Sequence, residues 1–301
     1  MAIGCDCKVG LSNTGRPNCV PLFSVVSSMI QVPLTANDGT KNKIDLTSLP
    51  TWSTLVNEAD ASKRWFPIPA FENVEVPKAD SLFEESASGR MAYLRQGKRS
   101  FSGELWADDS TPQFLGKLQK ARCVEFGVYI VDVNGNLIGS KEGTDLCPIP
   151  VDNDSWNPVF NFATDSTVQK IVLGFDFDRL YNDSSMYQIN PTEAGIDFRT
   201  LEGLVDVTLT FSGSISVNSL TVKGAFDYGT AVNPIKYEGA SLTTDWSISN
   251  ESSGAVLFPT TVAESPAGTY TLTYASQTIG DSLKVSVAKE GFTGEATGTV
   301  S

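Results

Sequence analysis

The stretch Cys123-Val-Glu-Phe-Gly-Val-Tyr-Ile-Val-Asp-Val-Asn-Gly-Asn-Leu-Ile-Gly139 carries the strongest fold signal in the sequence. Apolar residues recur at every second position from Val124 to Ile130, which places them on one face of a β-strand. Asn134-Gly135 then separates this strand from a second short apolar run, a strong signal for a β-hairpin with a type I′ turn. The central part of the chain is therefore expected to consist of antiparallel strands.

The same period of two recurs on both sides of this hairpin. In Lys170-Ile-Val-Leu-Gly-Phe-Asp-Phe-Asp178 every odd-numbered residue is apolar, while Lys170, Asp176 and Asp178 fall on the opposite face. Residues 100–106 and 205–211 alternate in the same way. Such alternation is typical of antiparallel sheets with one buried face and one solvated face.

One segment has a convincing helical pattern. Ser110-Thr111-Pro112 supplies an N-cap and a first-turn proline, and an apolar stripe continues to about residue 121. Residues 53–61 are a weaker candidate for a second, short helix. One helix beside many strands predicts a mainly β fold, a barrel or sandwich with a flanking helix.

The sequence changes character at Ser212-Gly213-Ser214, which we interpret as a hinge. Residues 1–22, rich in Gly, Asn and Pro, are predicted to form an N-terminal arm, and residues 23–212 a large β domain. Within that domain, residues 73–99 are charged and weakly periodic, which predicts a long loop that is functional or ordered by a partner. Residues 217–301 contain short strands at the spacing expected of a β-sandwich module.

Composition argues against several function classes. The 301 residues carry a net charge of −13 and include no histidine. An acidic surface is unsuited to tight binding of nucleic acid, which depends on Lys and Arg contacts to phosphates, although DNA could slide past it. Without histidine, Ser-His-Asp and Cys-His catalysis and histidine metal sites are excluded. We expect no enzymatic activity and no cofactor; the paired carboxylates Asp176 and Asp178 are also explained by a solvated strand face.

The five cysteines are an odd number in a large chain, which argues against a disulfide framework. Cys5, Cys7 and Cys19 are a weak candidate for zinc binding, with Cys123 or Cys147 as a fourth ligand, but their spacing fits no standard zinc motif. Free thiols are the simpler expectation. The N-terminus lacks an apolar signal region and no run approaches 18 apolar residues, so we expect a soluble protein made in a cytoplasm, without membrane anchoring.

Two longer passages resemble known families. The passages Phe71–Trp106 and Phe114–Asn136, a charged stretch and strand followed by a helix and hairpin, resemble the body of the tail tube proteins of tailed bacteriophages. The resemblance covers roughly residues 20–212. Gly268-Thr-Tyr-Thr-Leu272 resembles the penultimate strand of immunoglobulin-like domains. Residues 217–301 contain no cysteine and so lack the antibody-type disulfide; in this they resemble the immunoglobulin-like add-on modules of bacterial and phage proteins.

The resemblance implies a tail-tube-like β-barrel or sandwich followed by an immunoglobulin-like module. Tail tube subunits assemble as hexameric rings that stack into a hollow conduit for genome ejection, with a long loop between subunits or rings. The implied partners are further copies of the chain and other tail proteins, with DNA passing through unbound. The implied location is the virion tail, after synthesis in the host bacterial cytoplasm. The outer module is expected to touch host surface glycans weakly.

Two sets of site residues follow from these expectations. A DNA conduit should be lined with carboxylates, because they repel phosphates; the candidates on polar strand faces are Glu104, Asp176, Asp178 and Asp206. The long loop should meet a neighbouring subunit through charged residues; the candidates are Glu84, Glu85, Arg95, Lys98 and Arg99.

Two other function classes stay open. The same β modules occur in a capsid decoration, a head–tail connector or a baseplate component. A carbohydrate-binding or adhesion protein is a further alternative, against which the missing secretion signal counts. A tube subunit should polymerise by itself, whereas a decoration should stay monomeric or trimeric until it meets a capsid.

Overall fold

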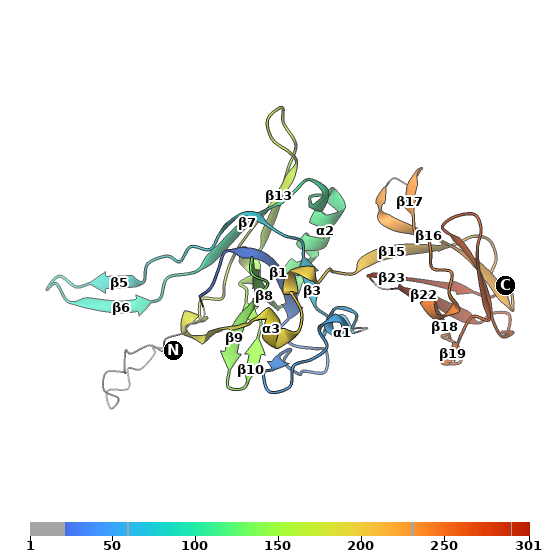
Figure 1. Cartoon of the computed structure of the whole chain (residues 1–301), viewed down its shortest axis with the longest axis horizontal. Helices are drawn as coiled ribbons and strands as arrows, with labels where there is room; N and C mark the ends of the chain where they lie inside the picture. The colour runs from blue at the N-terminus through green and yellow to red at the C-terminus, as the bar shows by residue number, and fades with distance from the viewer. Residues whose placement is uncertain (1–21, 59, 230–231, 290) are drawn as a thin grey trace.

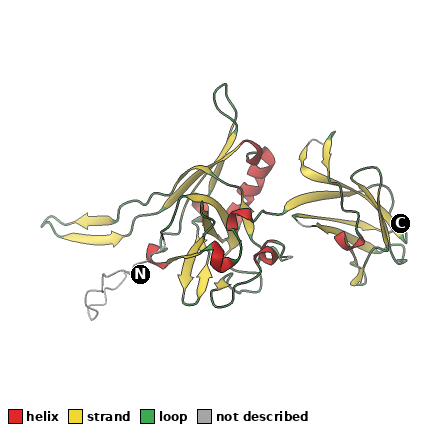
Figure 2. Cartoon of the chain, viewed as in Figure 1, coloured by secondary structure: helices red, strands yellow, loops and turns green. Residues whose placement is uncertain are grey.

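The computed structural model describes residues 22–58, 60–229, 232–289 and 291–301. The chain is mainly β, as predicted, and forms two β units that follow each other along the sequence (Figure 1). Strands dominate both units, and the few helices are short (Figure 2). The predicted N-terminal arm lies outside the described residues, except for Leu22.

The first unit is built on a central sheet with the strand order β2-β10-β9-β8-β1-β3; β11 also pairs with β8, and β14 with β9. Its strands are β1 (Val26–Pro33), β2 (Ile44–Asp45), β3 (Phe66–Ile68), β8 (Phe126–Asp132), β9 (Leu137–Glu142), β10 (Asp145–Cys147), β11 (Ile149–Pro150) and β14 (Met186–Ile189).

Strand β8 is buried along its whole length because both faces of this sheet are covered. Val128 and Ile130 pack into a core shared with a second sheet. Tyr129 and Val131 point the other way, into a core closed by α1 (Trp52–Val56) and by loop residues such as Phe198. The apolar residues at every second position of β8 therefore form one buried face, and the residues between them form a second buried face.

The second sheet has the order β12-β13-β7-β4 and packs on one face of the central sheet. Along β13, the odd-numbered residues from Ile171 to Phe175 are buried and the even-numbered ones are half-buried, which confirms the predicted alternation. The predicted helix is α2 (Pro112–Lys120), where the Thr111 hydroxyl accepts a hydrogen bond from the Phe114 N–H at 3.2 Å. The sheet consists of β4 (Glu72–Glu75), β7 (Ser100–Trp106), β12 (Asn157–Asn161) and β13 (Lys170–Asp176).

The predicted hairpin at Asn134-Gly135 joins β8 to β9, with Ile130 opposite Ile138. The predicted type I′ turn is wrong, because Gly135 has a φ of 77° while Asn134 has no positive φ. The loop is one residue longer and ends in a glycine bulge. The buried Asp132 side chain stabilises this wider loop by accepting hydrogen bonds from the Asn134 and Asn136 N–H groups, each at 2.9 Å.

The segment 73–99 is a projecting β-hairpin and not the predicted loop. Its two strands, β5 (Leu82–Glu85) and β6 (Met91–Arg95), extend away from the body of the first unit (Figure 1). Every residue of both strands is exposed. Apolar and polar residues alternate along a strand when one face is buried, and both faces of this ribbon are exposed. Residues 73–99 therefore show no strand pattern in the sequence. We call the hairpin β5–β6 the arm; it is distinct from the N-terminal arm predicted for residues 1–22.

The second unit is a sandwich whose two sheets share the strand β15. One sheet has the order β15-β16-β21-β20, and the other continues from β15 through β23, β22 and β18 to β19. The pairing of β15 with β23 is parallel. The later strands divide between the two sheets, β16, β21 and β20 in one and β23, β22, β18 and β19 in the other, which is the arrangement of an immunoglobulin-like sandwich. Its strands are β15 (Val205–Phe211), β16 (Ser219–Gly229), β17 (Pro234–Lys236), β18 (Trp246–Asn250), β19 (Ala255–Leu257), β20 (Thr261–Glu264), β21 (Thr269–Thr273), β22 (Ser282–Lys289) and β23 (Phe292–Thr299).

Two details of the predicted module are wrong. The module begins at β15 and not at residue 217, because Val207 and Leu209 pack in the core of the sandwich. The linker is therefore the segment 201–204, and Ser212–Ser214 is a turn within the module. The segment Gly268–Leu272 belongs to β21, which is followed by two further strands and so is not penultimate.

We expect a fragment of residues 205–301 to fold alone and a fragment of residues 217–301 to be much less stable. Loss of β15 removes two buried side chains, Val207 and Leu209, worth about 3–6 kcal/mol together. Thermal unfolding of the two fragments measures the difference. Equal melting temperatures would contradict the assignment of β15 to the module.

We also expect Gly135→Ala to destabilise the first unit more than Gly143→Ala. Both glycines lie in hairpin turns at positive φ, so each substitution carries a backbone strain of about 1–2 kcal/mol. An added methyl group at Gly135 would in addition overlap the Asp197 carboxylate, whereas nothing lies near Gly143. Denaturant unfolding should show a cost of about 3 kcal/mol or more at Gly135. Equal losses would contradict the close approach of Asp197.

Candidate functional site

The arm is an isolated two-stranded ribbon with regular pairing. Phe83 lies opposite Tyr93, and their rings meet edge to face with centroids 5.6 Å apart. Glu85 lies opposite Met91, and the strands are joined by a short turn in which Gly89 has a φ of 77°. A two-stranded hairpin without further packing is marginal in water. The arm therefore lacks, within one chain, the packing that would hold it firmly.

Large apolar side chains on the arm are half exposed. Phe83 and Met91 have exposed fractions of 48% and 58% and lie on the same face of the ribbon. Leu82 is 48% exposed and lies at the other end of β5, where the pairing with β6 shifts by one residue. Contiguous exposed apolar surface of this kind marks a site of protein–protein contact. The complete set is Leu82, Phe83, Met91, Tyr93 and Leu94.

Charged side chains hold the base of the arm to the body. The Arg99 guanidinium donates two hydrogen bonds to the Asp183 carboxylate, at 3.1 and 2.9 Å, and one to the Val76 carbonyl at 3.1 Å. Lys78 binds the same carboxylate at 2.6 Å. Hydrogen bonding from Arg99, followed by that from Lys78, holds the pKa of Asp183 below its usual range against the opposing effect of burial.

A second ion pair lies beside this one. Lys98 contacts Asp176 at 3.0 Å and Asp152 at 3.7 Å, and this hydrogen bond to Asp176 raises the pKa of Lys98. Asp176 also accepts a hydrogen bond from the Ser100 hydroxyl at 2.7 Å. The arm is thus anchored at its base and exposed at its tip.

The structure separates the five predicted subunit-contact residues into two groups. Glu84, Glu85 and Arg95 lie exposed on the arm, and among the described residues they form no ion pair. Lys98 and Arg99 are bound to Asp176 and Asp183 of the same chain and hold the base of the arm, and their contact with a neighbouring subunit stays a prediction. Sequence reasoning missed the apolar residues of the arm, because a run of mixed residues gave no periodic signal.

The four predicted lining carboxylates do not form one free acidic surface. Glu104 binds Lys170 at 2.6 Å, which together with Trp106 and Asn73 lowers the pKa of Glu104 against the effect of burial. Asp176 is bound by Lys98, as described above. Asp206 binds Lys117 at 2.9 Å and belongs to the second unit.

Asp178 is the remaining lining candidate, and it forms no ion pair among the described residues. Its carboxylate accepts a hydrogen bond from the Leu180 N–H at 2.6 Å and caps a turn beyond β13. Three of the four predicted carboxylates are therefore paired with a lysine, and their place along a conduit stays a prediction.

Only two of the five cysteines lie within the described residues. Cys5, Cys7 and Cys19, the candidate zinc ligands, lie outside the described residues. Cys123 is exposed and Cys147 is buried, both are free, and burial raises the pKa of Cys147 to about 11. Within the described ranges, no cluster of three or more metal-ligating side chains occurs. No helix of the described residues is long and apolar enough to cross a membrane.

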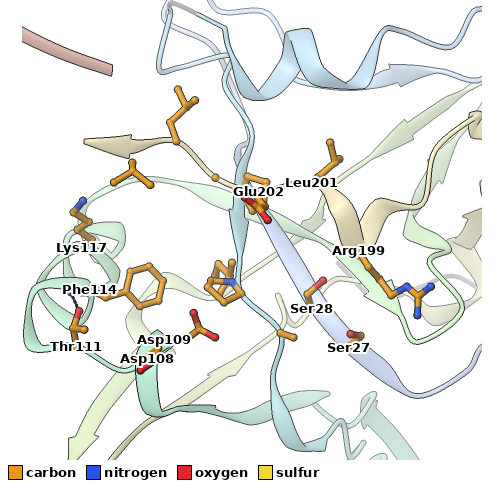
Figure 3. A pocket seen from close by; sticks show the side chains of 17 residues that line it. Ser27, Ser28, Asp108, Asp109, Thr111, Phe114, Lys117, Arg199, Leu201 and Glu202 are labelled. Carbon is orange, nitrogen blue, oxygen red and sulfur yellow. Dashed lines mark hydrogen bonds between the residues drawn. The ribbon is translucent and has the colours of Figure 1, made fainter. Parts of the chain in front are cut away.

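A cavity of about 470 Å³ lies between the body of the first unit and the linker (Figure 3). Phe114 and Lys117 of α2 line one side, and Arg199 and Leu201 line the other. Two of its charged groups are paired, since Lys117 binds Asp206 and Arg199 binds Asp197. The lining carboxylates Asp108, Asp109 and Glu202 form no ion pair among the described residues, and burial together with the neighbouring Asp108 raises the pKa of Asp109. The cavity lies at the joint between the two units, and its lining alone assigns no chemistry.

No protein-family model matches the chain, and no curated protein matches its sequence. Function has to be inferred from the arm, the sheet edges and the surface charges of the chain itself.

We expect acid to loosen the arm base. A carboxyl whose pKa is depressed on folding contributes stability above its unfolded pKa of about 3.9, and this contribution is lost as pH falls through the lower, folded pKa. Asp183→Asn should therefore cost about 1–3 kcal/mol at pH 7 and reduce the loss of stability below about pH 4. Thermal unfolding between pH 7 and pH 3 measures both effects.

The matched control is Asp154→Asn, which alters an exposed carboxylate without an ion pair among the described residues. This variant should follow the wild-type pH dependence. An Asp183→Asn protein with an unchanged pH dependence would show that the pairs at the arm base contribute nothing.

Proposed function

We propose that the chain is a structural, non-enzymatic subunit that assembles with copies of itself into the tail tube of a bacteriophage virion. The observation that supports this most directly is the arm, whose base is fixed by ion pairs while its two strands expose large apolar side chains. Such a ribbon is suited to being covered by other subunits.

The energy available from covering the arm is considerable. Five large side chains retain about half of their exposure, and burying the rest would contribute about 5 kcal/mol in total. Burial of the ribbon against another copy would also remove the weakness of an isolated hairpin.

Open sheet edges offer a second means of association. In the described residues of one chain, β12 pairs only with β13, and β4 only with β7, so each end of the second sheet has an unpaired edge. Unpaired edges invite further strands, and native proteins cover them. Two different edges joined head to tail through a closing rotation form a ring.

The charge of the chain agrees with a conduit. A net charge of −13 opposes binding of DNA through phosphates, so DNA could pass without being held. The candidates for the acidic lining are still Glu104, Asp176, Asp178 and Asp206, although lysines of the same chain offset the charge of three of them. The immunoglobulin-like module would be displayed on the outside of the tube, where a weak contact with host glycans is a further part of this proposal.

We expect the purified wild-type chain, concentrated at near-physiological salt, to form stacked rings or long hollow filaments in negative-stain electron microscopy. The double variant Phe83→Ser/Tyr93→Ser should remain in small particles, because it removes the aromatic pair from one face of the arm. Both residues are half exposed, so the fold should be preserved.

The matched control is Val256→Ser, which removes a 60% exposed apolar side chain from the second unit. This variant should assemble like the wild type. Single compact particles of the wild-type chain at all concentrations would contradict the tube and favour a capsid decoration or connector.

A further inference from the structure

A second projecting segment carries an exposed apolar patch. Residues 162–169 join β12 to β13 and extend from the end of the second sheet (Figure 1). Phe162 is 82% exposed and stacks edge to face on Phe160 at 5.2 Å. Val168 and Trp106, exposed by 47% and 44%, lie at the same end of the sheet. We call Trp106, Phe162 and Val168 the loop patch.

The arm and the loop patch lie at opposite ends of the same strands. Ser100 pairs with Asp176 at one end of the β7–β13 ladder, and Trp106 pairs with Lys170 at the other. The arm leaves from the Ser100 end, where the Ser100 N–H binds the Pro77 carbonyl at 2.9 Å. Seven residues of strand separate the two ends by about 20 Å. Two surfaces placed in this way can meet only between different copies.

The turns of the two segments carry opposite charges. Arg90 closes the turn of the arm, where its carbonyl accepts a hydrogen bond from the Ser86 N–H at 2.9 Å. Asp165 lies in the turn of the loop, between Thr164 and Thr167, which pair with each other. Both side chains are exposed, and neither forms an ion pair among the described residues. An arm that meets the loop would give each charge a partner.

Other exposed apolar residues of the first unit are less suited to receive the arm. Leu22, Phe23 and Val25 form another exposed apolar run, and the Val133 N–H binds the Val25 carbonyl at 2.8 Å. Arg199 lies beside this run and donates a hydrogen bond to the Val133 carbonyl at 2.8 Å, so the run is less complementary to a basic turn. Val124, Leu180 and Tyr187 lie on separate elements. Scattered single residues are normal on protein surfaces, whereas a group on adjoining strands marks a contact site. Within the described part of this unit, the loop patch is also beside an acidic turn, which complements the basic turn of the arm.

We propose that the arm of one copy docks on the loop patch of the next copy, with Arg90 facing Asp165. The contact is heterologous, because two different surfaces meet, and so the first copy keeps its patch free and the second keeps its arm free for further copies. This inference rests on the proposed self-assembly and adds to it the surface that receives the arm.

The test is a charge reversal followed by its compensation in the full-length chain. Arg90→Glu and Asp165→Arg should each raise the protein concentration needed for assembly by about tenfold, because like charges then face each other. The double variant should return to within about threefold of the wild type, because the pair is restored with its direction reversed. Sedimentation velocity over a concentration series measures all four proteins.

Two further variants serve as controls. Glu238→Arg reverses an exposed, unpaired carboxylate of the second unit and should leave assembly unchanged. Phe162→Ser removes the most exposed residue of the patch and should weaken assembly as much as either single reversal. Circular dichroism melts of every variant verify that the fold is retained.

The outcomes separate the two proposals. Wild-type assembly combined with reversals that do not compensate, or with a silent Phe162→Ser, would overturn the docking and leave the tube intact. A wild-type chain that never assembles would overturn both. Weakened single variants, a restored double variant and an inert Glu238→Arg would support the docking.

Discussion

The structure of the first unit depends on one strand being buried from both sides. Every residue of β8 is covered, and successive side chains alternate between the core under the second sheet and the core closed by α1. Because no position on this strand faces water, a shift in register by one residue would exchange two sets of apolar contacts of different shape. The hairpin to β9 is fixed in the same way by the buried Asp132 and by the loop that Gly135 permits.

Sequence patterns predicted the parts of the molecule that have one buried and one exposed face. The alternation in β13 and β15, the N-cap of α2 and the Asn-Gly hairpin were visible because burial and solvation differ along those segments. The alternation in β15 correctly predicted a strand, but the strand was assigned to the first unit and belongs to the second. Alternation does not show which sheet a strand joins. The turn type at Asn134-Gly135 was missed because the side chain of Asp132, outside the dipeptide, decides it.

The sequence drew attention to the segment that forms the arm, but it did not show which of its side chains are paired and which are exposed. The segment 73–99 stood out by its charge, and three of the residues named on it lie exposed on the arm. The sequence could not show that Lys98 and Arg99 find partners in β13 and in the loop beyond it, since these are about 80 residues away. The same long-range pairing offsets the negative charges of Glu104 and Asp206, whose partners Lys170 and Lys117 are equally invisible in a local pattern.

The shared strand β15 has a mechanical consequence. It is the first strand after the linker, and it is held on one edge by β16 and on the other by the parallel strand β23. A pull on the second unit through the linker is therefore transmitted along β15, and it loads the hydrogen bonds to β23 at residues 205–206 and those to β16 at residues 207–211 along the strand direction, in shear. Bonds loaded in shear must break together, and so they resist more force than bonds that open one at a time.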